Sequence, residues 1–202
     1  MSYANSIGKE VIPFGVVRRK EVNHNGVALD MRGIRKVFGR VVANDSVNFA
    51  VKEGEIHALL GENGAGKTTL MSILYGLYEP EEGTILHYGT PVRIASPFDA
   101  IRLGIGMVHQ HFELAEPLSV WENVVLGNEP TIGGSGFLDT RKSRDTVKEI
   151  AVQSGFSVEP DAVVETLPVG VRQRVEICKV LYRGAKILIF DEPTAVLTPL
   201  ES

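Results

Sequence analysis

The sequence has little cysteine, no long apolar run and no excess of positive charge. Its 202 residues include one cysteine, Cys178, so an internal disulfide is excluded and a reducing compartment is the natural environment. No stretch reaches about 18 apolar residues without a charge, which argues against a membrane-spanning helix. The formal net charge of −4 argues against a large electrostatic surface for nucleic acid.

The start of the chain lacks the features of a targeting segment. Charged residues and a proline interrupt any apolar run in residues 1–26, so a secretory signal is not expected. Because the same residues are polar and show no clear periodicity, they are predicted to form a disordered leader. These absences together predict a cytosolic protein. The hydrophobic content of 44% is enough for one sizeable core with a smaller subdomain.

A glycine-rich loop organises the rest of the chain. It follows an apolar run, residues 56–60, that is suited to a buried strand, and it precedes apolar residues at helical spacing. The pattern G-x-x-x-x-G-K-[ST] is met in full. The loop reads Gly61, Glu62, Asn63, Gly64, Ala65, Gly66, Lys67, Thr68 and Thr69.

This loop has the chemistry of a phosphate site. Glycine lets the main chain approach an anion closely, and the N–H groups of a first helical turn point toward it. The amides of Gly64, Gly66 and Lys67 are therefore predicted to wrap a phosphate. Lys67 would add a positive charge at the outer phosphates, and Thr68 would place its hydroxyl on Mg²⁺. An ordinary glycine-rich turn needs neither the lysine nor the threonine.

A second functional segment closes the last apolar run. Residues 186–190 are almost wholly apolar, as expected of a strand buried on both faces of a parallel sheet, and Asp191 and Glu192 follow. Carboxylates at the carboxyl edge of such a sheet are costly to bury without a cation. Asp191 is therefore predicted to meet Mg²⁺, and Glu192 to orient an attacking water. The alternative is an acidic turn at a strand end.

The N-terminal third reads as strands and the middle as helices. Strands are predicted over residues 27–32 and 47–51, with a loop at 36–40 in which Phe38 is either a base-stacking ring or a core residue. Further elements are predicted as follows: a strand at 84–89, a helix starting at Ser96, a strand at 104–108 before Gln110, a helix from 118 with a Ser119–Glu122 capping box, a helix capped by Asp139 or Thr140, and a helix over 171–182.

With these residues in place, the sequence resembles the nucleotide-binding subunit of ABC transporters from Val27 to its end. The loop at 61–69 is similar to the Walker A loop, residues 187–192 to the Walker B strand with its catalytic glutamate, and Gln110 to the Q-loop glutamine that touches Mg²⁺ and the membrane-domain contact. Phe38 falls where the adenine-stacking aromatic of the family lies. The resemblance implies catalytic roles for Lys67, Gln110 and Glu192.

The same resemblance implies an α/β fold. It consists of a P-loop NTPase core with a mainly parallel sheet, an antiparallel β subdomain on the N-terminal side and an inserted helical subdomain at about 113–182. Residues 27–202 would form this domain, incomplete at its C-terminus. The switch histidine of the family would lie beyond the last residue, so the isolated chain is expected to hydrolyse ATP poorly.

The signature motif departs from the pattern of the family. Where the family has Leu-Ser-Gly-Gly-Gln, this sequence has Leu167, Pro168, Val169, Gly170 and Val171. The family uses the serine and glycines to hold the γ-phosphate bound on the opposing domain. Pro168 has neither a hydroxyl nor an N–H, so phosphate capture through this motif rests on Gly170 and its neighbours.

Several segments narrow the resemblance. Residues 96–100, 104–112, 169–170 with 174–177, and 194–199 resemble the importers of nucleosides and simple sugars whose ATPase chain holds two such domains in tandem. The sequence is therefore expected to be the first domain of a longer protein. The resemblance implies ATP and Mg²⁺ as ligands. Its partners would be a second nucleotide-binding domain, permease subunits and, indirectly, a solute receptor, at the inner face of the plasma membrane and without nucleic acid.

Two other functions stay open. One is a soluble ABC ATPase in DNA repair or translation, which would be expected to carry a coiled-coil insertion, zinc cysteines or a basic surface. The other is a nucleotide switch that does not hydrolyse ATP, which Pro168 favours and Glu192 disfavours.

Overall fold

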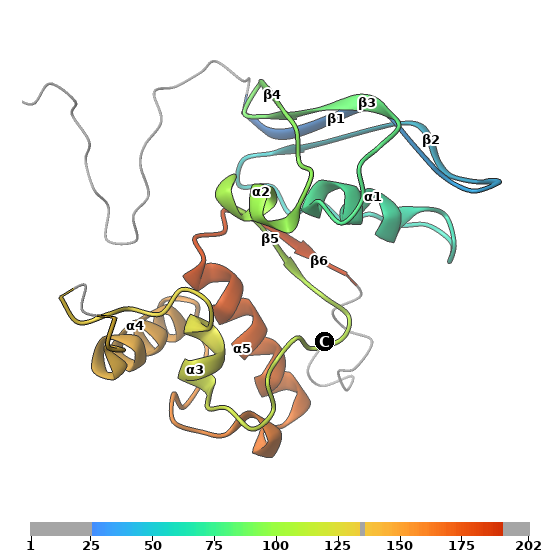
Figure 1. Ribbon diagram of the computed structural model, residues 1–202. Helices are drawn as coiled ribbons and strands as arrows, with labels where there is room; N and C mark the ends of the chain where they lie inside the picture. Colours follow the sequence, from blue (N-terminus) through green and yellow to red (C-terminus); the bar gives the residue numbers. More distant parts are fainter. Residues whose placement is uncertain (1–25, 134–135, 192–202) are drawn as a thin grey trace, which may run out of the picture. The chain divides into compact units, whose positions relative to one another are not determined.

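A computed structural model describes residues 26–133 and 136–191 of the chain (Figure 1). The chain divides into two compact units, Met1–Ala95 and Ser96–Ser202. Apart from Gly26, the predicted leader lies outside the described residues, and so does Glu192.

The first unit is built on a four-stranded antiparallel sheet with the order β2-β1-β3-β4. Helix α1, Lys67–Tyr75, contacts β2 and buries Leu70, Ile73 and Leu74, while β1 buries Leu29, Met31 and Ile34. Both the helix and the sheet of this unit thus bury apolar side chains. The strands are β1 Val27–Phe38, β2 Val41–Lys52, β3 Glu82–His87 and β4 Thr90–Val92.

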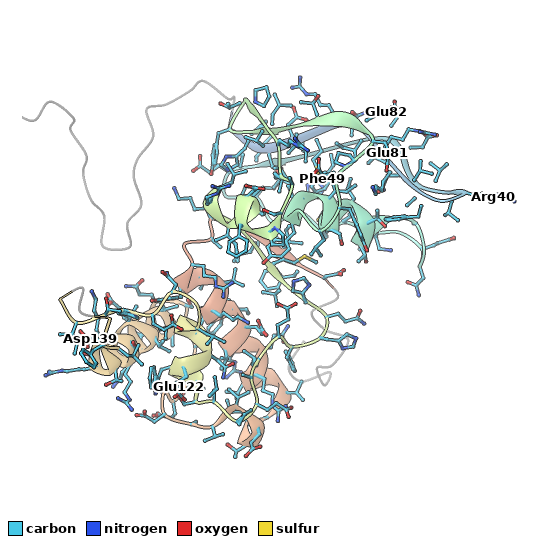
Figure 2. The ribbon with its side chains drawn as sticks, in the orientation of Figure 1. Arg40, Phe49, Glu81, Glu82, Glu122 and Asp139 are labelled. Atoms are coloured by element: carbon cyan, nitrogen blue, oxygen red, sulfur yellow. The ribbon has the colours of Figure 1, made fainter. Side chains whose placement is uncertain are left out.

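Strands β1 and β2 form a hairpin that is longer than the sequence pattern indicates. The predicted loop at 36–40 is wrong for its first three residues, because Lys36–Phe38 complete β1 and only Gly39 and Arg40 form the turn. Arg40 lies at the tip of the hairpin (Figure 2). Val37 pairs with Val42 and Phe38 with Val41, so β-branched and aromatic residues extend the ladder to the turn.

The strand predicted at residues 56–60 is absent. These residues have no regular structure, and the side chains of Ile56 and Leu60 are 100% and 88% exposed. A strand is stable only when its backbone groups pair with a neighbouring strand. No strand in the described ranges pairs with this segment. The segment has the apolar composition of a buried strand, but composition does not show whether a neighbouring strand is there to pair with it.

The second unit contains a parallel strand pair, β5 Ile105–Val108 and β6 Ile187–Phe190. Helix α2, Pro97–Arg102, precedes β5 and starts after Ser96 with the proline in its first turn, as predicted. The hydroxyl of Ser96 accepts a hydrogen bond from the Asp99 amide. Helix α5, Val169–Tyr182, packs directly on β5. A Cβ added to Gly106 would lie 2.2 Å from Cγ1 of Val180, so this close approach depends on the missing side chain.

Three helices and a short 3₁₀ turn form the rest of the second unit. They are α3 Val120–Val125, α4 Thr140–Gln153, the turn Val164–Thr166 and α5. Their shared core includes Trp121, Val124, Val147, Ile150 and Cys178. The predicted capping box of Ser119 and Glu122 opens α3, and Asp139 caps α4 (Figure 2). Helix α5 begins two residues before the predicted position.

None of the helices in the two described ranges combines the length and apolar character that crossing a bilayer requires.

Candidate functional site

The glycine-rich loop ends where α1 begins. Gly66 is the N-cap residue of α1 with φ 84° and ψ 8°, and Gly64 has φ 81°. Both conformations are left-handed, which favours glycine. The carbonyl of Gly66 accepts the first helical hydrogen bond from the Leu70 amide at 2.9 Å. The loop therefore turns sharply into the positive end of a helix, as the sequence predicts for an anion site.

The Lys67 side chain folds back into this loop. Its Nζ donates to the carbonyls of Gly61 at 2.7 Å and Glu62 at 2.8 Å. An ammonium group has three N–H donors, so these two bonds leave one for a ligand. The loop carbonyls thus hold a full positive charge beside the amides that start α1.

Strand β2 fixes the position of the loop. A Cβ added to Gly66 would lie 2.2 Å from the carbonyl oxygen of Ala43, and the buried Asn44 donates from Nδ2 to the Gly66 carbonyl at 3.2 Å. Only glycine fits at this contact. The remaining loop positions are at or near the surface: Asn63, Ala65 and Thr68 are exposed, and Thr69 is half-buried.

Phe38 lies at the turn end of the β1–β2 hairpin. Its side chain is 41% exposed, which places it at the surface and not in the core. Its strand partner is Val41, two residues before Ala43 on β2. Because a strand advances about 3.3 Å per residue, this pairing lies roughly 7 Å along β2 from the residue that touches Gly66. The aromatic ring and the phosphate loop are therefore anchored on the same few residues of β2.

Charged side chains hold the segment around Phe38. Lys36 donates from Nζ to the Glu79 carbonyl at 2.7 Å and to Oε1 of Glu81 at 2.8 Å, while the Val37 amide donates to Oε2 of Glu81 at 2.9 Å (Figure 2). The bond from Lys36 is the main reason that the pKa of Glu81 is lowered. The Lys36 amine also lies 5.3 Å from the centre of the Phe38 ring.

The ends of β5 and β6 bring Gln110 and Asp191 to one edge of the parallel pair. Val108 pairs with Phe190, and the Asp191 amide donates to the Val108 carbonyl at 3.1 Å. Gln110 is exposed in the bend that follows β5. Both residues thus follow the carboxyl ends of neighbouring parallel strands, where ligands bind in open α/β sheets.

The signature segment forms the start of α5. Pro168 is the N-cap residue, and its carbonyl accepts from the amides of Val171 and Arg172 at 3.0 Å each. Nε of Arg172 donates to the Leu167 carbonyl at 3.0 Å. Val169 is exposed and Gly170 is buried. The helix therefore begins inside the motif although Pro168 provides no side-chain cap.

The structure also reveals residues that the sequence pattern did not identify. Glu176 and Lys179 on α5 bind the backbone of Glu113, which follows the Gln110 bend. The sequence predicted a helix over residues 171–182 and, for Glu176, a place in a segment that resembles the importers, but no contact for either side chain. A buried acid on such a helix interrupts the apolar spacing, but its partner is 63 residues away in the sequence and leaves no local signal.

The predicted site residues divide between the two units. Lys67, Thr68 and Phe38 belong to the first unit, and Gln110 and Asp191 belong to the second. The expectation that Lys67 and Asp191 meet at one Mg²⁺-bound nucleotide stays a prediction.

Comparison with known proteins agrees with these features. The sequence profile of the ABC transporter family matches residues 44–195. The structure is similar to cbiO1 from Clostridium perfringens, part of the ABC transporter complex cbiONQ, with a TM-score of 0.72 and 30% identity over 87% of this chain and 69% of that one. The fold is that of P-loop NTPases, a mixed α/β arrangement with an antiparallel sheet and helices.

Two curated relatives are more similar in sequence. The nucleoside import ATP-binding protein NupA of Lactococcus lactis subsp. cremoris (strain MG1363) is 56% identical over 88% of this chain and 35% of its own length. The guanosine import ATP-binding protein NupO of Bacillus subtilis (strain 168) is 54% identical over 86% of this chain and 34% of its own length. The chain thus spans about a third of these relatives. The matched profile, which covers more than half of the sequence, shows that this chain belongs to the ABC transporter family.

Proposed function

We propose that this chain is the ATP-binding and ATP-hydrolysing part of an ABC importer for a small solute, a nucleoside or simple sugar. The observation that carries the proposal is the loop at 61–69, whose lysine is held among its own carbonyls at the start of α1. The two nucleoside importers among the relatives support the solute class.

In this proposal the first unit binds the nucleotide. The amides of Gly64, Gly66 and Lys67 hold the phosphates, and the Lys67 ammonium exchanges a loop carbonyl or uses its third N–H to reach the outer phosphate. The exposed face of Phe38 stacks on adenine. The other loop residues that line the nucleotide are Gly61, Asn63, Ala65, Thr68 and Thr69.

Mg²⁺ would bind together with the nucleotide. The described residues contain no group of three His, Cys, Asp or Glu side chains that could hold a metal ion by themselves. This fits Mg²⁺, which in nucleotide sites binds one or two protein oxygens together with phosphates and water. We propose the Thr68 hydroxyl, the Gln110 amide oxygen and the Asp191 carboxylate as its protein ligands. The ion would neutralise charge on the phosphates.

Hydrolysis would require Glu192, which lies outside the described residues. The resemblance of residues 187–192 to the Walker B segment assigns it the orientation of the attacking water. Leu167, Pro168, Val169, Gly170 and Val171 would face the nucleotide of a second nucleotide-binding domain. Pro168 removes a donor from that contact, which favours a switch without hydrolysis as the second candidate.

The proposed assembly places the chain at the cytoplasmic face of the plasma membrane. Two nucleotide-binding domains close on ATP, and the Gln110 region together with the helical part at about 113–182 passes the closure to permease subunits. A solute receptor acts on the other side. Isolation of the chain with a permease supports this assembly, and isolation with nucleic acid supports the soluble alternative.

Nucleotide binding is tested by replacing the lysine of the loop. Lys67→Ala should weaken ATP binding measured by calorimetry, while Lys148→Ala, which removes an exposed lysine from α4, should not. Equal binding by wild type and Lys67→Ala contradicts the proposal.

Turnover is tested at the acidic residue after β6. Glu192→Gln should bind ATP like the wild type and abolish phosphate release. The purified 202-residue chain itself should bind nucleotide but release phosphate slowly, and rapid turnover would contradict that expectation.

A further inference from the structure

The segment that follows Gln110 is held by α5 through both backbone groups of one residue. The Glu113 amide donates to Oε1 of Glu176 at 2.5 Å, and the Glu113 carbonyl accepts from Nζ of Lys179 at 2.6 Å. Glu176 and Lys179 lie one helical turn apart, so both point to the same side of α5. A single peptide segment is thus clamped at its donor and its acceptor.

The two α5 side chains of the clamp are largely buried, whereas Glu113 is exposed. Glu176 is 5% exposed, and the Lys179 side chain is 12% exposed. The carboxylate and the ammonium are 3.9 Å apart, so each partly balances the charge of the other. Burial raises the pKa of Glu176, which shows the cost of placing an acid here. Burying a carboxyl group costs free energy, and an apolar residue would fill the same space without that cost. The hydrogen bond from the distant Glu113 amide is the interaction that an apolar residue could not make.

A second anchor lies two residues further along the same segment. The buried Asn123 on α3 accepts from the Ala115 amide at 2.7 Å and donates to the Ala115 carbonyl at 3.0 Å. The chain from Gln110 to α3 is therefore fixed to α5 at Glu113 and to α3 at Ala115. Gln110 itself stays exposed only three residues before the first anchor.

We infer that Glu176 and Lys179 are positioning residues that set the place of Gln110 relative to α5, the helix that starts at the signature segment. This inference rests on the proposed role of Gln110 as a Mg²⁺ ligand. If α5 moved when the second nucleotide-binding domain bound, the Glu113 peptide would move with it. Gln110, between β5 and this peptide, would approach or leave the ion accordingly. The clamp thereby links metal binding to the part that meets the second domain.

The clamp itself is tested by hydrogen exchange at single amides of the 202-residue chain. The Glu113 amide should be protected in the wild type, exchange faster in Glu176→Ala, and regain protection in Glu176→Gln, because a glutamine oxygen still accepts its hydrogen bond. Glu149→Ala, an exposed acid on α4, is the matched control. Unchanged exchange in Glu176→Ala overturns the inference. Fluorescence of the buried Trp121 checks that each variant is folded.

The functional link is tested by calorimetry with ATP alone and with ATP plus Mg²⁺. Mutation of a residue that does not bind the metal itself but orients a metal ligand typically lowers metal affinity about 10- to 100-fold. Glu176→Ala should therefore reduce the gain in ATP affinity from Mg²⁺ about tenfold, leave binding without Mg²⁺ unchanged, and be largely restored in Glu176→Gln. Lys179→Met should act in the same direction. Glu149→Ala should retain the wild-type gain.

The double variant separates this inference from the proposed function. If Gln110 acts through the clamp, Gln110→Ala and Gln110→Ala/Glu176→Ala should lose the same amount. Losses that add, or a wild-type Mg²⁺ gain in Glu176→Ala, overturn the inference while the proposed function stands. No loss in Gln110→Ala overturns the metal role and the inference with it, and Lys67→Ala then still tests ATP binding.

Discussion

The close contact between β5 and α5 makes a quantitative prediction for Gly106. An alanine Cβ there would lie 2.2 Å from Cγ1 of Val180 and 2.9 Å from Cβ of Ala185. Carbon atoms in contact are normally about 3.5–4.0 Å apart, so the helix or the strand must shift by roughly 1.3 Å or more. Overpacking of this kind costs about 1–3 kcal/mol. Gly106→Ala should therefore lower the free energy of unfolding by about that amount.

A second substitution supplies the diagnostic test. Val180→Ala alone removes two buried methyl groups and should cost about 1.6 kcal/mol, at about 0.8 kcal/mol for each. In the double variant the new methyl at residue 106 occupies part of the space that Val180 vacates. The double variant should therefore lose at least about 1 kcal/mol less unfolding free energy than the two single variants lose in sum, which is within the range of coupling energies for residues in contact.

The assay is urea denaturation followed by the fluorescence of Trp121. It is the only tryptophan of the chain and lies buried in the helical core that includes α5. Val124→Ala, in the same core and outside the contacts of residue 106, is the control, and its cost should add to that of Gly106→Ala. Additive losses for the Gly106 and Val180 pair, or no loss in Gly106→Ala, would refute the reasoning.

Three further predictions concern the phosphate loop, the thiol and the buried acid. Gly66→Ala and Gly64→Ala each place a side chain in a left-handed backbone conformation, which costs about 1–2 kcal/mol of stability. Only the new Cβ of Gly66→Ala would also lie 2.2 Å from a backbone oxygen, so Gly66→Ala should lose about 1–3 kcal/mol more stability than Gly64→Ala. Hydrogen exchange of the α1 amides measures this difference. Equal losses would contradict this. Burial raises the pKa of Cys178 to about 11, so Ellman's reagent should label it at about pH 8 only after unfolding, and rapid labelling of the folded chain would contradict the burial. The raised pKa of Glu176, which faces Lys179, Glu113 and His109, means that its contribution to stability is full below its unfolded pKa and falls as the pH rises through its folded pKa. In urea curves, Glu176→Gln should therefore become progressively more stable than the wild type as the pH rises above the ordinary glutamate pKa of about 4.3. A difference that does not change with pH would argue against the raised pKa.

Local signals in the sequence predicted the parts of the fold that depend on neighbouring residues. The start of α2 at Ser96, the capping box of Ser119 and Glu122, and the cap of α4 at Asp139 are confirmed. In each case a side chain bonds to a backbone amide three residues away, so the whole interaction lies within one turn. The turn of the glycine-rich loop into α1 is also local, although Gly66 caps α1 without a side-chain hydrogen bond and depends on its left-handed backbone conformation.

Features that depend on distant residues were missed or wrong. The segment at 56–60 has the composition of a strand, but a strand needs a partner that composition does not provide. Strand β1 extends to Phe38 because its last residues pair with β2. The sequence around Phe38 and Gly39 looks like a loop and gave no sign of this pairing. The contact of Glu176 with Glu113 spans 63 residues and has no local signature. Sequence patterns thus predicted the turn of the glycine-rich loop into α1 but not the contacts of Glu113, three residues after Gln110.

The central claim is that Lys67 and Asp191 act on a single metal-bound nucleotide. It is tested most directly by replacing Mg²⁺ with Fe²⁺ in the ATP complex and mapping where ascorbate and peroxide cut the backbone. The account predicts ATP-dependent cuts in two separate places, beside the loop at 61–69 and beside Asp191 at the end of β6, and their joint loss in Lys67→Ala. Cuts confined to one of these places, with ATP bound, would contradict it.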